Sequence, residues 1–319
     1  MVNKRILVTG GAGFIGSHIV DLLAAENCRN IVIVDNFVRG SPDNLAAALR
    51  CQNVTLVKGD VRDAALMREL VGASDIVFHQ AALRITHCAE EPRTALETMV
   101  DGTFELAQLC ADSGVEKIIY ASSASIYGMA DSFPISERHH SNSDRTFYGV
   151  AKLFGEGVLR ALGVPHTALR YFNVYGPRMD IHGRYTEVLV RWMERIDAGA
   201  PPIIFGDGKQ TMDFVDVRDV ARANLLAAKS EISGQAFNIA SGIETSLFQL
   251  ATYLAVAMER PQLVPVMQAS RGATAVERRL GDGEKARKML GFTPEITLQQ
   301  GLLDLVAWWR GKSKSKAGT

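Results

Sequence analysis

The chain of 319 residues carries no net formal charge, and 47% of its residues are hydrophobic and 22% charged. This balance is typical of a globular protein of one or two domains, and it argues against nucleic acid or an anionic membrane as the main partner. No stretch approaches the ~20 apolar residues of a membrane span, and the apolar run at residues 6–8 is cut at once by Thr9-Gly10-Gly11, unlike a signal peptide. The four cysteines are far apart, so we expect reduced thiols in a cytoplasmic protein and no metal site.

The first predicted strand, residues 5–9, leads into a glycine-rich turn and then a predicted helix. Gly10, Gly13 and Gly16 allow a tight turn in which amides at the helix N-terminus can approach a pyrophosphate. The second predicted strand ends in Asp35, where a carboxylate accepts hydrogen bonds from an adenosine ribose and repels a 2′-phosphate. The pattern therefore predicts NAD rather than NADP as the cofactor.

The alternation of strands and helices continues through the first half of the chain. Three more strands are predicted at 54–57, 76–79 and 118–120, with helices at 63–71 and 92–113. Polar or small residues follow these strands, namely Asp60 and Val61, then Gln80, Ala81 and Ala82, then the serine-rich segment 121–128. Because such an alternation forms a parallel sheet with ligands at the carboxyl ends of its strands, we predict an α/β fold with a Rossmann-type, doubly wound sheet.

Tyr148 and Lys152 lie four residues apart in a run of helix-forming residues, so their side chains share one face of a predicted helix. A phenol with an ordinary pKa of ~10 is a poor base at neutral pH, but a nearby ammonium lowers that pKa by favouring the phenolate. The pair is therefore a candidate general acid/base. Tyr-x-x-x-Lys alone is also common on surface helices, so this interpretation depends on the other motifs.

After Pro177 the pattern changes to a second, smaller α/β unit. A predicted helix at 185–198 turns Leu189, Trp192 and Ile196 inward. Further strands are predicted at 203–205, 214–217 and 237–239, with helices at 219–228, 246–258, 284–290 and 298–309. We therefore predict an NAD-binding domain of residues 1–172 plus about 211–240, and a substrate-binding domain of residues 173–210 plus about 241–319.

Together these motifs resemble the extended short-chain dehydrogenase/reductase family, and within it the NAD-dependent nucleotide-sugar epimerases and dehydratases of the UDP-glucose 4-epimerase type. The resemblance covers nearly the whole chain. The matching motifs occur in the family's order, at residues 9–16, 35, 59–61, 79–82, 122–128, 148 and 152, 170–177 and 206–220.

The resemblance implies a role for each matching residue. Tyr148 would be the acid/base acting on a sugar hydroxyl, Lys152 would hold the nicotinamide ribose and tune Tyr148, and Ser123 would bridge the same sugar oxygen. NAD would be bound by Gly10, Gly13, Phe14, Ile15, Gly16, Asp35, Asn36, Asp60, Val61, Gln80, Ala81, Ala82, Tyr148, Lys152 and Tyr171. The nucleotide sugar would be bound by Ser123, Ser125, Tyr148, Asn173, Arg184, Arg271 and Arg279, with Asn173 at the diphosphate.

One position departs from the family pattern. Many members carry an arginine before the Asp213-Phe214 pair that contacts the nucleotide diphosphate, and this chain has Met212 there. Arg271, or Arg278 with Arg279, could supply the counter-charge, although a solvated surface role is at least as common for such residues.

The two residues after Ser123 indicate the reaction. Family dehydratases have an Asp-Glu pair at this point and related decarboxylases a glutamate, whereas this chain has Ala124 and Ser125. Elimination of water would lack its acid and base, but hydride transfer needs only Tyr148, Ser123 and the nicotinamide. We therefore predict epimerisation at C4 of a nucleotide-activated sugar, with a UDP-sugar the first choice, through a transient 4-keto intermediate.

Three alternatives stay open. The first is a nucleotide-sugar 4,6-dehydratase whose acid comes from elsewhere. The second is a UDP-glucuronate 4-epimerase in which Arg184 or Arg279 pairs with the C6 carboxylate. The third is a non-catalytic, NAD-sensing binding protein, although such relatives usually lose the tyrosine or the lysine. Family members commonly dimerise through helices that match residues 94–113 and 148–163, so we expect a homodimer.

Overall fold

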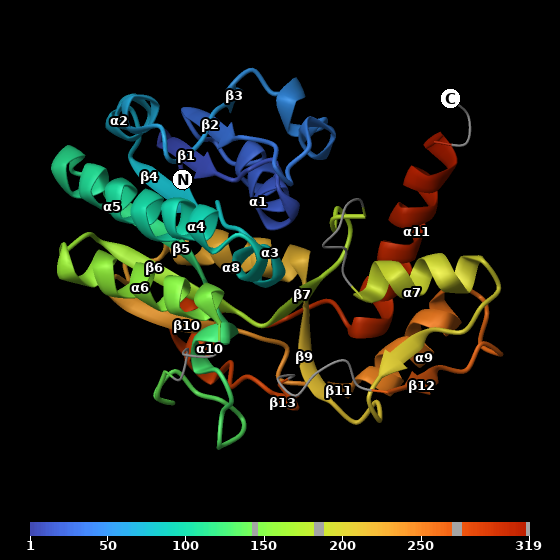
Figure 1. Ribbon diagram of the computed structural model, residues 1–319. Coiled ribbons are helices and arrows are strands. Elements are labelled where there is room, and N and C mark those ends of the chain that lie inside the picture. The colour runs from blue at the N-terminus through green and yellow to red at the C-terminus, as the bar shows by residue number, and fades with distance from the viewer. Residues whose placement is uncertain (142–145, 182–187, 270–275, 317–319) are drawn as a thin grey trace.

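A computed structural model describes residues 1–141, 146–181, 188–269 and 276–316, the last four by their backbone alone. Its main layer is a parallel sheet of seven strands in the order β10-β6-β5-β4-β1-β2-β3 (Figure 1). The strands are β1 (Arg5–Thr9), β2 (Asn30–Asp35), β3 (Val54–Lys58), β4 (Ile76–His79), β5 (Lys117–Ser123), β6 (His166–Tyr171) and β10 (Gln235–Ile239). The predicted Rossmann-type α/β fold is confirmed.

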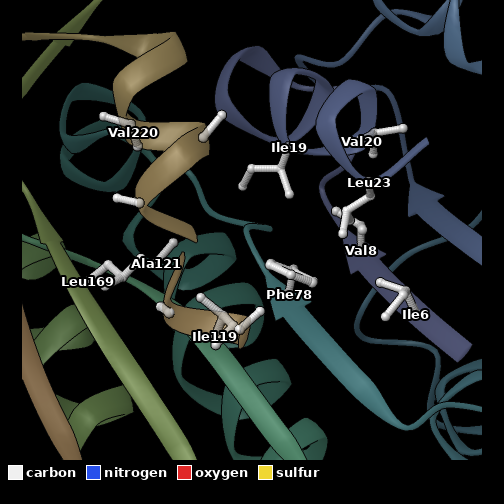
Figure 2. Close-up of a cluster of buried hydrophobic side chains, with 14 of the residues drawn as sticks. Ile6, Val8, Ile19, Val20, Leu23, Phe78, Ile119, Ala121, Leu169 and Val220 are labelled. Carbon is white, nitrogen blue, oxygen red and sulfur yellow. The ribbon is translucent and has the colours of Figure 1, made fainter. Parts of the chain in front are cut away.

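Helices cover both faces of this sheet. On one face lie α1 (Phe14–Ala24), α8 (Val217–Lys229) and α10 (Glu284–Leu290), and on the other α2 (Ala64–Gly72), α5 (Gly102–Ser113) and α6 (Phe147–Ala161). Side chains of a strand alternate between the two faces of the sheet. Ile6 and Val8 of β1 therefore pack in a first apolar layer, under α1, α8 and α10, and Leu7 packs in a second layer, under α2, α5 and α6. Figure 2 shows this first layer, to which α1 contributes Ile19 and α8 contributes Val220.

Shorter helical segments lie in the connections. They are α3 (Ile85–Glu90), α4 (Pro92–Ala95), a π-helical stretch over Leu96–Asp101 that leads into α5, and single 3-10 turns at Pro42–Leu45, Ala48–Arg50 and Ala124–Tyr127. None of the helices in the described part of the chain has the length and apolar character needed to cross a membrane.

The smaller unit is built around β9 (Thr211–Asp216). It pairs with β7 (Asn173–Tyr175), β11 (Glu244–Ser246) and β13 (Arg278–Arg279), while β8 (Ile203–Phe205) pairs with β12 (Val266–Gln268). The helices α7 (Val188–Asp197), α9 (Leu247–Ala257) and α11 (Leu298–Lys316) enclose a second apolar core that contains Trp192 and Trp309. These helices lie beside the large sheet rather than over it (Figure 1).

The domain boundaries stay a prediction, and the pairing of β9 bears on the boundary near residue 211. The predicted boundary assigns β9 to the first domain, but β9 pairs with strands of the smaller sheet. The chain returns to the large sheet only with α8 and β10. The sequence of β9 mixes apolar residues with Asp213 and Asp216 and does not by itself indicate which sheet the strand joins.

A buried ion pair fixes α6 to the sheet directly beneath the carboxyl ends of β5 and β6. Arg170 donates from Nη2 to Glu156 Oε2 at 2.7 Å and from Nε to Oε1 at 2.9 Å, and Ser122 Oγ donates to the same Oε1 at 2.5 Å. The side chains of Arg170 and Glu156 are only 9% and 3% exposed. Both charges are therefore withdrawn from water and depend on each other.

Replacement of Glu156 by glutamine is expected to destabilise the protein by about 3–5 kcal/mol, because the Arg170 guanidinium would stay buried without a carboxylate. Urea denaturation followed by circular dichroism measures the change. The control is Glu116→Gln, which removes the exposed partner of Lys4 and should cause a much smaller loss. Equal losses in the two variants would contradict the structural role of the buried pair.

Candidate active site

A cleft of about 760 Å³ runs along the carboxyl ends of the sheet strands and reaches the smaller unit. All of the residues predicted to bind NAD line it except Asp60, which faces an adjoining pocket that also touches Val61. Of the predicted substrate residues, Ser123, Ser125, Tyr148, Asn173 and Arg279 line the cleft. Arg184 and Arg271 lie outside the residues that the structure describes.

The glycine turn after β1 leaves room for a ligand against the backbone. Gly10 has φ +66°, and a Cβ there would lie 2.7 Å from the Ala81 nitrogen. A Cβ at Gly16 would overlap the Gly10 carbonyl oxygen. Gly13 precedes α1 without a side-chain cap, so amides of the first helical turn are free to bind an anion such as a pyrophosphate.

Asp35 at the end of β2 is held in place by the backbone. Its Oδ2 accepts from the Ala12 amide at 3.0 Å and its Oδ1 from the Phe37 amide at 2.8 Å. Burial raises the pKa of this carboxyl above its usual value. Asp60, by contrast, is bound by the guanidinium of Arg62 and by the Asn36 amide, and these contacts lower the pKa of Asp60.

Two hydrogen-bond networks involve the residues at the end of β4, and Gln80 and Tyr171 of the first network line the cleft. Tyr171 donates from its hydroxyl to Gln80 Oε1 at 3.1 Å, and Gln80 donates in turn to Asn224 Oδ1 at 3.1 Å. His79 is bound by the hydroxyls of Thr9 and Thr103, and burial lowers the pKa of its imidazole to about 3. His79 is thus a neutral packing residue at physiological pH.

The first turn of α6 presents Tyr148 and Lys152 to the cleft. Thr146 caps the helix by accepting from the Gly149 amide at 3.0 Å. Ser123, at the end of β5, donates a hydrogen bond from its hydroxyl to the Tyr148 phenol. Lys152 Nζ lies 5.7 Å from the centre of the Tyr148 ring and donates to the Ala121 carbonyl at 2.6 Å. The three residues predicted to be catalytic therefore meet at one point.

The predicted effect of Lys152 on Tyr148 is wrong for the protein alone. Burial raises the pKa of the Tyr148 phenol above its ordinary value, and this outweighs the lowering by the Ser123 hydrogen bond and by the charges of Arg39 and Arg84. Lys152 itself is turned toward Ala121, and burial lowers its pKa to about 8. Tyr148 therefore gains basicity at neutral pH only if a ligand brings a further positive charge or hydrogen bond.

Four arginines from four segments line the cleft, namely Arg39, Arg84, Arg178 and Arg279, and the sequence analysis identified only the last as a site residue. Arg39 follows β2 and pairs with Asp180 at 3.5 Å, and Arg84 follows β4. Burial and, to a smaller extent, the charge of Arg39 together lower the pKa of the Arg84 guanidinium to about 10. Both positions follow strand ends, which is the signal that could have identified them.

Arg279 lies next to Met212, the position where the family's arginine is absent. The two residues are Cα partners in the pairing of β13 with β9, and both line the cleft. Arg278 lies elsewhere, since its Nε donates to Glu244 at 2.7 Å and its guanidinium covers the Phe133 ring. Of the arginines considered as replacements, Arg279 is the one that the described structure places in the cleft.

Potential metal ligands gather away from this cleft. In the described part of the chain, ligand atoms of Asp131, His139 and His140 lie within 4.8 Å of one another, on the loop that precedes α6. His139 Nε2 lies 3.0 Å from Asp131 Oδ1, and none of the three residues lines the cleft. The contact between His139 and Asp131 accounts for the proximity of these ligand atoms without a metal.

Comparison with known proteins decides the family. The model of the NAD dependent epimerase/dehydratase family matches residues 6–240. The chain belongs to this family. The resemblance found in the sequence is confirmed, and with it NAD as the cofactor, for which the glycine turn and the fixed carboxylate of Asp35 provide a fitting site.

Relatives within the epimerase/dehydratase family carry out several reactions. A UDP-glucose 4-epimerase of Mycolicibacterium smegmatis is 35% identical and covers 97% of this chain and 100% of its own. A UDP-N-acetyl-alpha-D-glucosaminuronate decarboxylase of Bacillus cytotoxicus is 32% identical, and the match covers 97% of this chain and 98% of the decarboxylase. The structure of a dTDP-glucose 4,6-dehydratase from Streptomyces venezuelae with NAD bound superposes with a TM-score of 0.89 at 27% identity, covering 98% of both chains. The chain is thus an NAD-dependent enzyme of nucleotide-sugar metabolism.

Replacement of Gly16 by alanine is expected to weaken NAD binding at least about tenfold, because the new methyl group would overlap the Gly10 carbonyl and force the turn open. Titration of the purified protein with NAD by calorimetry measures the loss. Gly157→Ala on α6 is the control, since a Cβ there meets no atom within 4 Å. Wild-type affinity in Gly16→Ala would show that the cofactor does not use this turn.

Proposed function

We propose that this epimerase/dehydratase family member inverts C4 of a UDP-sugar through a transient 4-keto intermediate. The observation that carries the proposal is the meeting of Ser123, Tyr148 and Lys152 at the cleft with no carboxylate directly after Ser123. Ala124 is buried and aprotic, and Ser125 lines the cleft with a hydroxyl. Neither side chain can serve as the acid or base of an elimination at ordinary pKa values.

Each residue has a chemical task in this scheme. Tyr148 removes the proton from the C4 hydroxyl and later returns it, and Ser123 stabilises the same oxygen through its hydroxyl. Lys152 anchors the nicotinamide ribose. When bound, NAD would supply reversible hydride transfer at C4, so that the hydride can return to either face of the sugar ring. Asn173 on β7 and Arg279 on β13 flank the cleft on the side of the smaller unit, where the nucleotide sugar is expected to bind.

The alternatives differ in what they require of the cleft. A 4,6-dehydratase needs an acid and a base near C5 and C6. Of the carboxylates that line the described cleft, Asp35 is held by the Ala12 and Phe37 amides and Asp180 is paired with Arg39 at 3.5 Å, while Glu90 also lines it. An NAD-sensing protein without turnover would have no need of Tyr148 and Lys152, and both are present in the cleft. A UDP-glucuronate 4-epimerase uses the same residues as a neutral-sugar epimerase and differs only in the ring substituent.

Replacement of Tyr148 by phenylalanine is expected to lower turnover about 10²–10⁴-fold, because it removes the proton-transferring hydroxyl and keeps the ring. The wild-type protein and the variant are each incubated with one UDP-sugar at a time: UDP-glucose, UDP-N-acetylglucosamine or UDP-glucuronate. NMR and mass spectrometry identify the products. Tyr253→Phe on α9, away from the cleft lining, is the control. A product of unchanged mass with inverted C4 supports the proposal, whereas loss of one water would assign the enzyme to the dehydratases.

We further propose a homodimer that forms through α5 and α6, in the cytoplasm, where the four unpaired cysteines would stay reduced. The two helices lie side by side on one face of the sheet (Figure 1). Phe104 of α5 is 39% exposed, and Val150 and Phe154 of α6 are 47% and 36% exposed. Val150 and Phe154 are four residues apart and therefore share one face of the helix. A second copy of the chain would cover this apolar surface.

Replacement of Phe154 by glutamate is expected to convert the dimer to a monomer, because a charge would be buried in the interface. Size-exclusion chromatography with light scattering measures the mass. Phe248→Glu on α9 is the matched control, since Phe248 is 37% exposed but lies in the smaller unit. A monomeric wild-type protein, or an unchanged mass in Phe154→Glu, would overturn the proposed interface.

A further inference from the structure

The four residues that follow the turn after β7 are held from two sides, and we call residues 177–180 the clamp segment. They lead out of β7, which pairs with β9 in the smaller sheet. Met179 is only 4% exposed and belongs to the apolar core of the smaller unit. Pro177, Arg178 and Asp180 instead contact residues that belong to α1 and to the loop after β2. The clamp segment therefore joins the smaller unit to the cofactor side of the large sheet.

Two of these contacts come from one face of α1, the helix that begins at the glycine turn. His18 Nε2 lies 3.0 Å from the Pro177 carbonyl oxygen, and Arg178 Nη2 donates to Asp21 Oδ2 at 2.6 Å. A carbonyl oxygen only accepts, so Nε2 is the protonated nitrogen of His18. Burial lowers the pKa of this imidazole to about 4, so it is neutral at physiological pH. Phe14, one turn before His18, packs against the core of the smaller unit, so this whole stripe of α1 faces that unit.

A third contact comes from the loop after β2. Arg39 Nε lies 3.5 Å from Asp180 Oδ2, and the two side chains are 28% and 20% exposed. The same loop begins after Asp35, the carboxylate proposed for the adenosine ribose, and a Cβ at Gly40 would lie 2.7 Å from Asp35 Oδ1. The clamp segment is thus tied both to the helix after the pyrophosphate turn and to the loop after the ribose carboxylate.

The conformation of the clamp segment depends on these contacts. Arg178 has φ +68°, in the left-handed region that a residue with a Cβ rarely adopts. Such a conformation costs free energy and persists only where the surrounding structure fixes it. Nη1 of Arg178 and Oδ1 of Asp21 are buried without a partner among the described residues, so the hydrogen bond through Nη2 is what holds this pair together.

The two residues of α1 act at a distance from any ligand. Neither His18 nor Asp21 lines the cleft, whereas Arg178, Met179 and Asp180 do. His18 and Asp21 can therefore affect a ligand only through the clamp segment. NAD at the glycine turn would restrict α1 and the loop after β2, and their contacts would then restrict this wall of the cleft. A wall that is fixed in advance binds its ligand more tightly, because less order has to be gained on binding.

We propose that the clamp segment couples the two ligand sites, with Asp21 and His18 as positioning residues, so that NAD raises the affinity of the cleft for the nucleotide of the substrate. Such coupling is reciprocal, so the nucleotide raises the affinity for NAD by the same factor. The inference rests on the part of the proposed function that binds the nucleotide sugar against the smaller unit, and it does not depend on the reaction at C4.

Calorimetry measures the coupling without turnover. UDP and, separately, dTDP are titrated into the protein with and without saturating NAD, and NAD is titrated with and without each nucleotide. In the wild-type protein each ligand is expected to bind about tenfold more tightly in the presence of the other. Asp21→Asn keeps the shape of the side chain and removes its charge, so the coupling should fall to about twofold or less. The affinity of this variant for NAD alone should stay close to that of the wild type, because Asp21 does not line the cleft.

Glu26→Gln is the matched control. Glu26 follows α1 and pairs with Lys229 of α8 at 2.6 Å, so this ion pair does not involve the smaller unit, and its loss should leave the coupling unchanged. A charge swap is the second variant. Asp21→Arg alone should abolish the coupling, and Asp21→Arg combined with Arg178→Asp should regain most of it, because opposite charges again face each other and aspartate is among the residues that tolerate a positive φ.

Three results would overturn the inference: equal affinities with and without the second ligand in the wild-type protein, no binding of either nucleotide to the NAD-loaded protein, or full coupling in Asp21→Asn. A loss of affinity for NAD alone that equals the loss of coupling would also refute it, since Asp21 would then support the cofactor turn itself. Product analysis tests the reaction separately. C4 inversion by a protein without coupling would refute the clamp and keep the proposed function, and coupling in a protein that does not invert C4 would do the reverse.

Discussion

The active site depends on how closely α6 can approach β5. A Cβ at Gly155 would overlap the phenol of Tyr120, so the helix packs against the strand at a distance that only glycine permits. The ion pair between Glu156 and Arg170 then fixes its rotation, because both charges are buried and lie 2.7 Å apart. With the helix held in this way, Tyr148 and Lys152 face the end of β5 and meet Ser123.

The packing of α6 against β5 places the reactive residues at the carboxyl ends of the sheet strands, where the glycine turn after β1 also lies. The parallel strands bring their carboxyl ends to one edge, so residues far apart in sequence form one cleft without long loops. A chain with no net charge concentrates Arg39, Arg84 and Arg279 there. The local excess of positive charge fits ligands that carry a pyrophosphate or a diphosphate, and it explains why an overall charge of zero does not exclude anionic substrates.

Local patterns were sufficient to predict six of the seven strands of the large sheet and its main helices, because periodicity and turn residues are properties of short segments; β6 was not predicted as a strand. The two- and three-residue strands β7, β11, β12 and β13 have no such pattern, and the pairing of β9 with the smaller sheet depends on partners far away in sequence. The proximity of Arg279 to Met212 also depends on strand pairing between distant segments. The raised pKa of Tyr148 could not be predicted, because it follows from burial by the assembled protein rather than from the spacing to Lys152.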